Sequence, residues 1–284
     1  MIDDAIIAAQ TPADDFTIDQ VWSAYTAEEH AIWDLLYERQ KNLLRGRTTK
    51  EFLNGLEKLS LSDGGIPDLS ILNPKLKALT GWTVVMVPHL VPDEVFFEHL
   101  ANKRFPAGRF IRKRNQLDYL EEPDIFHDIF GHVPLLTHSV FADYMQAYGK
   151  GGLRSLEYDT LKNLARLYWY TVEFGLIQTP EGLRHYGAGI VSSFGEAQYS
   201  LEDKSPHHIE FDLMRIMKTN YKIDDYQDCY FVINSFDQLF ESTQQDFDPL
   251  YKQLLEDDHN YAPQDIITTD NIIQKGTLEY SGAR

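Results

Sequence analysis

Apolar residues recur every three to four positions along much of the chain, and this is the spacing of amphipathic helices. The first such helix is predicted from Thr26, because Thr26-Ala27-Glu28-Glu29 has the form of a capping box and apolar residues follow at helical spacing. The same spacing predicts further helices from Thr48 or Thr49, over about 68–80, after Pro92, from Pro123 to Pro134, and over about 138–149, 158–178, 209–218 and 235–243.

Strand-like segments are few and short. β-Branched and apolar residues gather in Trp82–Val87, which Pro88 closes, and similar compositions mark Phe105–Arg114 and Tyr230–Ile233. We therefore predict a mostly α-helical fold with a few short β-strands, in a single compact domain that spans residues 1–284. Within it, residues 1–20 are expected to form a loosely held N-terminal tail and residues 257–284 an extended C-terminal tail.

The charge balance limits the classes of partner. The chain carries 26 Lys and Arg against 44 Asp and Glu, a formal net charge of −18, which argues against binding to nucleic acid or to an anionic membrane surface. Its single cysteine, Cys229, excludes an intrachain disulfide, and the N-terminus has neither the basic segment nor the apolar core of a signal peptide. A cytoplasmic protein is therefore expected.

Two histidines stand out in the helix predicted between Pro123 and Pro134. His127 and His132 are five residues apart, which on an ideal α-helix separates them by about 140° of rotation. They can converge on one metal ion only if the helix ends or distorts between or just after them, and Gly131 and Pro134 offer places for such a break. The alternative is that both are core histidines satisfied by backbone groups.

A third candidate ligand, Glu173, lies in a strongly aromatic run, Tyr168-Trp169-Tyr170-Thr171-Val172-Glu173-Phe174. The segment from Leu164 to Leu176 is apolar on almost all sides, which is typical of a buried helix. A carboxylate in such a helix is expected to bind a metal or to form an ion pair. The candidate for the ion pair is Arg166, seven residues earlier.

Two histidines and one carboxylate form a facial triad, which leaves half of an octahedral metal open for other ligands. This arrangement favours a non-haem Fe(II) site that handles O2, although Zn(II) and Mn(II) accept the same donors. Three protein ligands without a thiolate indicate a catalytic site. The alternative is a zinc-dependent hydrolase with Asp128 or Glu196 as general base, against which stands the lack of a His-Glu-x-x-His motif.

Three long motifs carry a resemblance to a known family. They are Glu122-Pro123-Asp124-Ile125-Phe126-His127-Asp128-Ile129-Phe130-Gly131-His132-Val133-Pro134-Leu135, Leu167-Tyr168-Trp169-Tyr170-Thr171-Val172-Glu173-Phe174-Gly175-Leu176, and Tyr186-Gly187-Ala188-Gly189-Ile190-Val191-Ser192-Ser193-Phe194-Gly195-Glu196. In their order and spacing they resemble the aromatic amino acid hydroxylases, monooxygenases that use tetrahydrobiopterin and non-haem iron. The similarity extends from about residue 15 to about residue 255, and it implies a catalytic domain of the aromatic amino acid hydroxylase type.

The resemblance assigns roles by position. His127, His132 and Glu173 match the family's Fe(II) ligands, and Arg112 matches the arginine that binds the amino acid's carboxylate, a role suited to the planar guanidinium. The ring pocket is matched by Trp169 and Pro123, and Ser192 matches a hydrogen-bonding position near that pocket and the first histidine. The pterin site is matched by Phe96, Leu90, Val91, Asp128 and Tyr168.

The sequence pattern alone favours plainer interpretations for several of these residues. Phe96 and Tyr168 would be core residues, Asp128 a charge on a helix surface, and Arg112 a solvated charge in a basic run.

The resemblance also implies a substrate and an assembly state. Ile223 falls where phenylalanine-specific members carry an apolar residue and tyrosine-specific members an acid, so the expected reaction converts L-phenylalanine to L-tyrosine with O2 and tetrahydrobiopterin or a related reduced pterin. Hydroxylation of tryptophan or tyrosine is the alternative, and a non-catalytic iron-storing or pterin-binding module is a more distant one. Because the chain has no room for a regulatory domain and no long heptad-bearing C-terminal helix, a monomer is expected.

Overall fold

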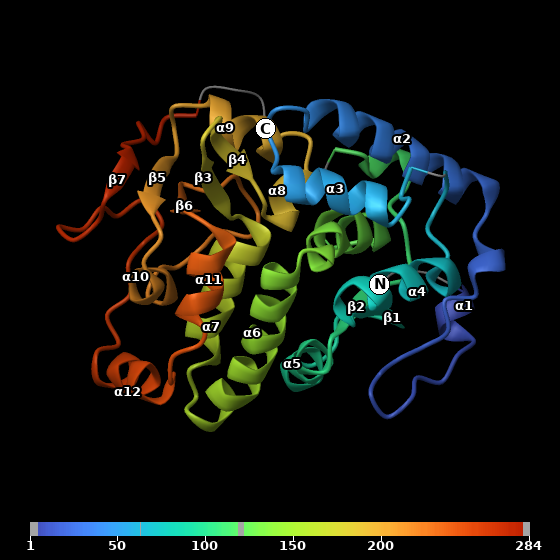
Figure 1. Cartoon of the computed structure of the whole chain (residues 1–284), viewed down its shortest axis with the longest axis horizontal. Coiled ribbons are helices and arrows are strands. Elements are labelled where there is room, and N and C mark those ends of the chain that lie inside the picture. The colour runs from blue at the N-terminus through green and yellow to red at the C-terminus, as the bar shows by residue number, and fades with distance from the viewer. Residues whose placement is uncertain (1–4, 63, 119–121, 281–284) are drawn as a thin grey trace. The chain divides into compact units, whose positions relative to one another are not determined.

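The structure is a computed structural model that describes residues 5–62, 64–118 and 122–280 (Figure 1). Helices dominate, and the strands are three to five residues long, which confirms the predicted fold class. Contacts group the chain into two compact units, one made of residues 1–42 and 50–150 and the other of residues 43–49 and 151–284. The extent predicted for a single domain stays a prediction.

The first unit holds a two-stranded parallel sheet with helices. Strand β1 (Thr83–Val87) pairs with β2 (Arg104–Gly108), and α5 (Asp93–Ala101) forms the connection between them. The other elements of this unit are α1 (Ala5–Ala8), η1 (Trp22–Ala24), α2 (Ala27–Leu43), α3 (Lys50–Lys58), α4 (Leu69–Thr80), η2 (Arg114–Gln116), η3 (Phe126–His132), η4 (Val133–Thr137) and the start of α6 (Ser139–Glu157).

The second unit contains a five-stranded mixed sheet in the order β4-β3-β6-β5-β7. The central strand β6 runs parallel to both β3 and β5, while β4 and β7 are antiparallel edges. The elements are α7 (Leu161–Tyr168), η5 (Trp169–Glu173), β3 (Leu176–Thr179), β4 (Gly182–His185), α8 (Ala188–Ser192), α9 (Glu196–Glu202), β5 (His207–Glu210), α10 (Leu213–Met217), β6 (Cys229–Ile233), α11 (Phe236–Ser242), α12 (Asp248–Glu256) and β7 (Ile272–Gln274).

Most of the predicted helices are present, and the capping box of α2 is confirmed. The Thr26 Oγ1 accepts the Glu29 N–H at 3.2 Å, and the Thr26 N–H donates to Glu29 Oε2 at 2.7 Å. The segment predicted to be an extended C-terminal tail contributes β7, whose Ile272 pairs with Ile209 of β5. The N-terminal segment includes α1 and a bridge from Ile18 to Met86.

Three predicted elements are wrong in part. The helix predicted over 158–178 ends at Glu173, and β3 follows. Gly175 lies between them and packs so tightly that a Cβ there would lie 2.1 Å from the Tyr186 ring. The helix predicted over 209–218 begins only at Leu213, and its first residues belong to β5. The strand predicted over 105–114 ends at Gly108, because beyond it the backbone bonds to other partners, including the Asp124 side chain.

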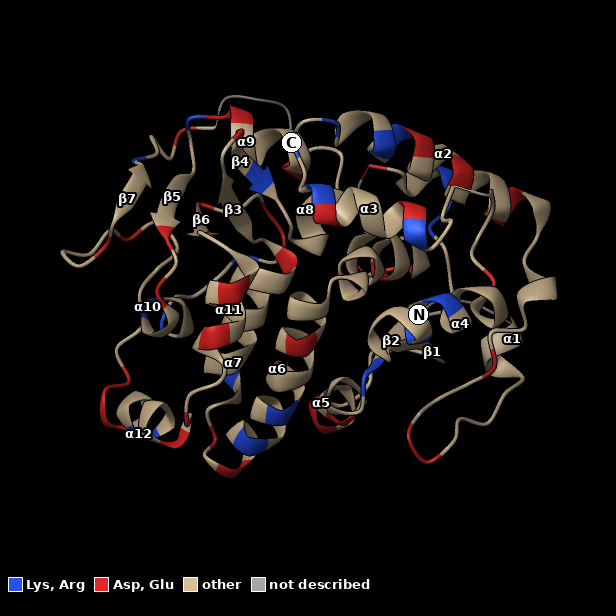
Figure 2. Ribbon diagram, viewed as in Figure 1, with Lys and Arg blue, Asp and Glu red and all other residues tan. Residues whose placement is uncertain are grey.

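The charge distribution agrees with the acidic composition. Figure 2 shows acidic positions on helices of both units, including α5 and α11. The first turn of α5 contains Asp93 and Glu94, and that of α11 contains Asp237. Within the described ranges, no helix combines the length and the apolar character that crossing a membrane requires.

Candidate metal centre

The helix that carries both histidines is a π-helix. Residues Phe126–His132 form η3, and the backbone then tightens into the 3-10 turn η4 at Val133–Thr137. A π-helix bonds residue i to residue i+5, so side chains five residues apart lie on the same face of it. The distortion required by the His127–His132 spacing is therefore present, and it spans both histidines instead of following them.

The two imidazoles meet through the same ring atom. His127 Nε2 and His132 Nε2 are 3.2 Å apart, and the rings are nearly perpendicular, with centroids 5.0 Å apart. His132 is buried beside Phe105, whose ring centroid is 4.8 Å away, while His127 is partly exposed. The two rings are therefore not separated from each other in the fold, and their role as metal ligands stays a prediction.

Asp124 fixes the start of the histidine helix and holds Arg112. Its Oδ1 accepts the backbone N–H of His127 at 3.0 Å, as an N-cap carboxylate does. The same carboxylate accepts Arg112 Nε at 2.8 Å and Nη2 at 2.9 Å, and both side chains are buried. One carboxylate therefore links the predicted substrate arginine to the predicted metal ligand.

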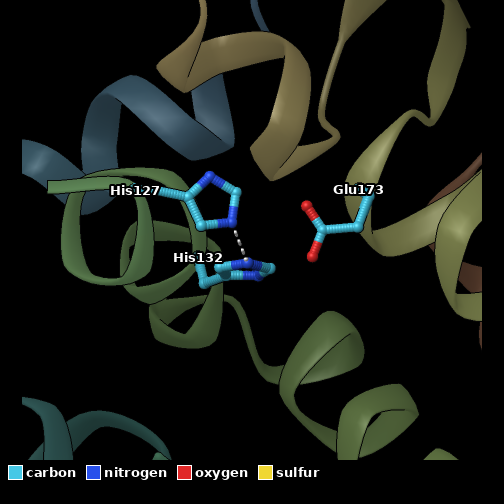
Figure 3. A group of neighbouring side chains, drawn as sticks. All are labelled: His127, His132 and Glu173. Carbon is cyan, nitrogen blue, oxygen red and sulfur yellow. Dashed lines mark hydrogen bonds between the residues drawn. The ribbon is translucent and has the colours of Figure 1, made fainter. Parts of the chain in front are cut away.

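Glu173 is the last residue of a second π-helix, η5 (Trp169–Glu173), which continues α7. Its predicted alternative partner, Arg166, bonds elsewhere: the guanidinium donates to Met217 O at 3.1 Å and to the side-chain oxygens of Asn220 and Asn260. The ion-pair interpretation of Glu173 is therefore not supported. Figure 3 shows the carboxylate directed toward the two imidazoles.

One ligand atom from each of His127, His132 and Glu173 lies within 4.8 Å of the other two. Metal bonds of about 2.0–2.2 Å to nitrogen and oxygen donors place neighbouring ligand atoms about 3 Å apart, so these three side chains fit a single ion after small rotamer adjustments. Two imidazoles and one carboxylate also suit Fe(II), and they occupy only one face of an octahedron.

Comparison with known proteins agrees with this geometry. Residues 14–274 match the family model described as biopterin-dependent aromatic amino acid hydroxylase. The chain belongs to this family. It is 58% identical over 269 residues to the phenylalanine-4-hydroxylase of Caulobacter vibrioides, covering 95% of this chain and 91% of the relative.

Solved structures of phenylalanine hydroxylase from Chromobacterium violaceum are similar throughout. A single-residue variant matches with a TM-score of 0.93 and 52% identity, covering 96% of this chain and 100% of the other. A structure with iron and phenylalanine bound matches with a TM-score of 0.88 and 54% identity, covering 92% and 95%. Membership of the hydroxylase family excludes the alternative of a zinc-dependent hydrolase.

The hydroxylase residues predicted around the substrate occupy varied environments. Trp169 is half-buried and begins η5, four residues before Glu173, and its Nε1 donates to Gln227. Ser192 is buried in α8 and donates to Ala188 O at 2.7 Å, whereas Pro123 is exposed just before η3. Arg112 is 7% exposed, so its interpretation as a solvated charge is wrong.

The residues predicted at the pterin site belong to elements of both units. Leu90 is 81% exposed and Val91 half-buried in the loop that follows β1, and Phe96 is half-buried on α5 with its ring edge against Phe97. Tyr168 is half-buried at the end of α7. Asp128 is buried and accepts the Gly108 N–H at 2.7 Å, so its interpretation as a helix-surface charge is wrong.

Two residues with structural roles at this site were absent from the sequence prediction. Asp124 carried a signal, because a Pro-Asp pair before an apolar helical run is typical of an N-cap. Gln227, which accepts the Trp169 N–H, carried none, since a single polar residue in a loop has no pattern of its own.

Glu196, the other candidate base of the rejected hydrolase, is a buried acid. Burial raises the pKa of its carboxyl from 4.5 to about 7, against the opposing effect of hydrogen bonds from the Tyr230 hydroxyl and the Gln227 N–H. Since the folded protein binds this proton more tightly than the unfolded chain, the carboxyl contributes stability that is present below pH 4.5 and is lost as the pH rises through 7.

Replacing Glu196 with Gln is expected to remove this dependence. The free energy of unfolding of Glu196→Gln, measured relative to wild type by urea titration, should rise between pH 4.5 and 8 by up to about 3 kcal/mol. His185→Gln provides a control of opposite sign, because burial lowers the pKa of His185 to about 3 and its contribution is lost as the pH falls below 6.5. A Glu196→Gln difference that is constant with pH would contradict the assignment.

Proposed function

We propose that this hydroxylase converts L-phenylalanine to L-tyrosine with O2 and a reduced pterin, at a non-haem Fe(II) ion held by His127, His132 and Glu173. The observation that carries the proposal is the grouping of one ligand atom from each of these side chains within 4.8 Å in a chain of the biopterin-dependent family. Names of relatives such as the Caulobacter vibrioides phenylalanine-4-hydroxylase support phenylalanine as the substrate.

Arg112 is proposed to bind the carboxylate of phenylalanine. Its Nε and Nη2 donate to Asp124, and Nη1 makes a single, long hydrogen bond among the described residues, to Leu117 O at 3.4 Å. The edge formed by Nη1 and Nη2 can meet another carboxylate with two parallel N–H donors. Asp124 would hold the guanidinium in position, so little side-chain entropy is lost when the substrate binds.

The aromatic ring of the substrate is proposed to lie against Trp169, with Pro123 and Ser192 completing its surroundings. Ile223, which is 77% exposed in the segment before β6, is the proposed determinant that distinguishes phenylalanine from tyrosine. An apolar side chain offers no partner to the hydroxyl of tyrosine, and an unpaired buried hydroxyl costs free energy.

The pterin is proposed to stack on Phe96 and to bond to the backbone at Leu90 and Val91, with Asp128 and Tyr168 beside it. When bound, Fe(II) and the reduced pterin supply the activation of O2, from which one oxygen atom enters the ring and the other leaves on the oxidised pterin. The chain's residues orient the ring and the pterin and keep water out, and no protein acid or base is required for the attack on the ring.

We also propose that residues 1–284 form one catalytic domain that works as a cytoplasmic monomer. The buried free thiol of Cys229 is compatible with a reducing compartment. If the protein is a monomer, size-exclusion chromatography with light scattering should give a mass of 32.8 kDa; a multiple of this mass would contradict the proposal.

The proposed function is tested by metal reconstitution. Apo-protein loaded anaerobically with Fe(II) is expected to form tyrosine from phenylalanine only when both reduced pterin and O2 are added, whereas Zn(II)-loaded protein should form none. Zn(II) binds the same donors but has no redox chemistry, so it is a matched control for site occupancy. Tyrosine formation without pterin, or with Zn(II), would contradict the proposal.

A further inference from the structure

The indole of Trp169 is held by a buried glutamine. Trp169 Nε1 donates to Gln227 Oε1 at 2.9 Å, and Gln227 is only 2% exposed. Both residues belong to the second unit, although 58 positions separate them in the sequence. An indole N–H can only donate, so the amide oxygen is a specific partner for it.

The orientation of the Gln227 amide is determined by its other contacts. Its Nε2 donates to Lys222 O at 2.9 Å and to Asp225 O at 3.2 Å, and carbonyl oxygens can only accept. The amide oxygen must therefore face Trp169. The Gln227 side chain therefore forms hydrogen bonds within the segment 221–227 and also bonds this segment to the Trp169 indole.

The same segment also covers the indole face. The Tyr221 ring stacks on Trp169, with ring centroids 4.3 Å apart and ring planes 15° apart. The ring centroid of Phe174 lies 4.8 Å from that of the indole. The indole is thus fixed at its edge by Gln227 and at its face by Tyr221, and both of these residues belong to the segment that carries Ile223.

The backbone beneath this arrangement is anchored in the core. The Gln227 N–H donates to Glu196 Oε1 at 3.4 Å, and the Tyr230 hydroxyl donates to the same oxygen. Glu196 and Tyr230 are buried. Gln227 therefore connects buried core residues to a half-buried indole, which is the arrangement of a residue that sets the position of another.

We propose that Gln227 is a positioning residue that sets the ring specificity of the hydroxylase, by holding Trp169 and the Ile223 segment at a fixed separation. The inference rests on the proposed role of Trp169 against the substrate ring. Without the amide, the indole turns away from its site and the segment loosens, so the ring site admits a larger aromatic. Gln227 acts through Trp169 and does not itself touch the substrate.

The test compares Gln227→Met with wild type in the Fe(II)-loaded enzyme. The ratio of kcat/KM for phenylalanine to kcat/KM for tryptophan is expected to fall about 5- to 50-fold, the effect of losing a buried hydrogen bond with its partners left unpaired. Most of the loss for phenylalanine should appear in KM, and its Kd by calorimetry should rise in parallel. Tyrosine formed per pterin oxidised should also fall, because a misplaced ring leaves pterin oxidation intact.

Controls separate positioning from a general loss of stability. Gln40→Met removes another fully buried glutamine, on α2, and should lower Tm without changing the substrate ratio. If Gln227→Met does not fold, Gln227→Asn keeps the amide but is one methylene too short to bridge its partners, and the same ratio is measured.

The decisive comparison uses Trp169→Phe, which has no indole N–H. Adding Gln227→Met in this background should change the ratio far less than in wild type. An unchanged ratio in Gln227→Met, or an undiminished change in the Trp169→Phe background, would overturn the inference. Wild-type tyrosine formation in the same series tests the proposed function separately.

Discussion

Replacing Glu173 with Ala is expected to reduce iron affinity more than about 100-fold and to abolish coupled tyrosine formation. The change removes the only carboxylate of the proposed triad, and losses of outer-sphere partners alone cost about 10- to 100-fold in metal affinity. Bound iron is measured by metal analysis after dialysis against a weak chelator, and tyrosine is measured per pterin oxidised.

Glu181→Ala is the matched control, because Glu181 is an exposed acid at the turn between β3 and β4. It should bind iron and form tyrosine as wild type does. The conservative Glu173→Gln variant keeps the shape of the side chain and removes its charge, so it should retain the fold and still lose iron. Unchanged iron occupancy and coupling in both Glu173 variants would remove this residue from the metal site.

The second large effect is expected at Arg112. Arg112→Ala should raise KM for phenylalanine at least about 30-fold. This rise corresponds to a loss of about 2–5 kcal/mol of binding free energy, which is expected if the substrate carboxylate is bound in a desolvated site. This variant also leaves the buried Asp124 carboxylate without its partner, which costs about 3–5 kcal/mol of folding stability. Arg112→Lys keeps the charge but loses the second pair of N–H donors, so it isolates the effect on binding.

The KM for the reduced pterin distinguishes a local effect from a general one. It should change little in Arg112→Lys, while the KM for phenylalanine rises. Asp124→Asn tests the supporting role of the carboxylate, and we expect a smaller rise in KM for phenylalanine together with a lower Tm, because the same group caps η3. An unchanged KM for phenylalanine in folded Arg112→Lys would show that Arg112 does not bind the substrate.

The types of the site residues could be predicted from the sequence, but the helix geometry that unites them could not. The spacing of His127 and His132 excludes a shared stripe on an α-helix, so it indicates that the helix is distorted. The nature of the distortion, a π-helix, depends on tertiary packing. Phe126 and Phe130 stack with centroids 4.7 Å apart inside the core, and no local propensity of these residues indicates π-helical backbone.

The partners of Arg112 and Trp169 also lay outside what the pattern could show. Asp124 is twelve residues from Arg112, and Gln227 is 58 residues from Trp169, so both contacts are products of the fold. The short strands β3, β4, β5 and β7 were missed for a related reason. Strands of three or four residues contain too few positions for alternation to appear, and the two adjacent isoleucines of β7 are both exposed, so they do not alternate between a buried and a polar face.

An iron- and pterin-dependent monooxygenase that acts on phenylalanine must place one atom of O2 in its product. The source of the oxygen atom in tyrosine is therefore the decisive measurement. Fe(II)-loaded enzyme is supplied with phenylalanine, reduced pterin and O2 labelled with heavy oxygen, and the tyrosine is analysed by mass spectrometry. We predict one labelled oxygen atom in each tyrosine; unlabelled tyrosine, or label taken instead from heavy-oxygen water, would contradict the account.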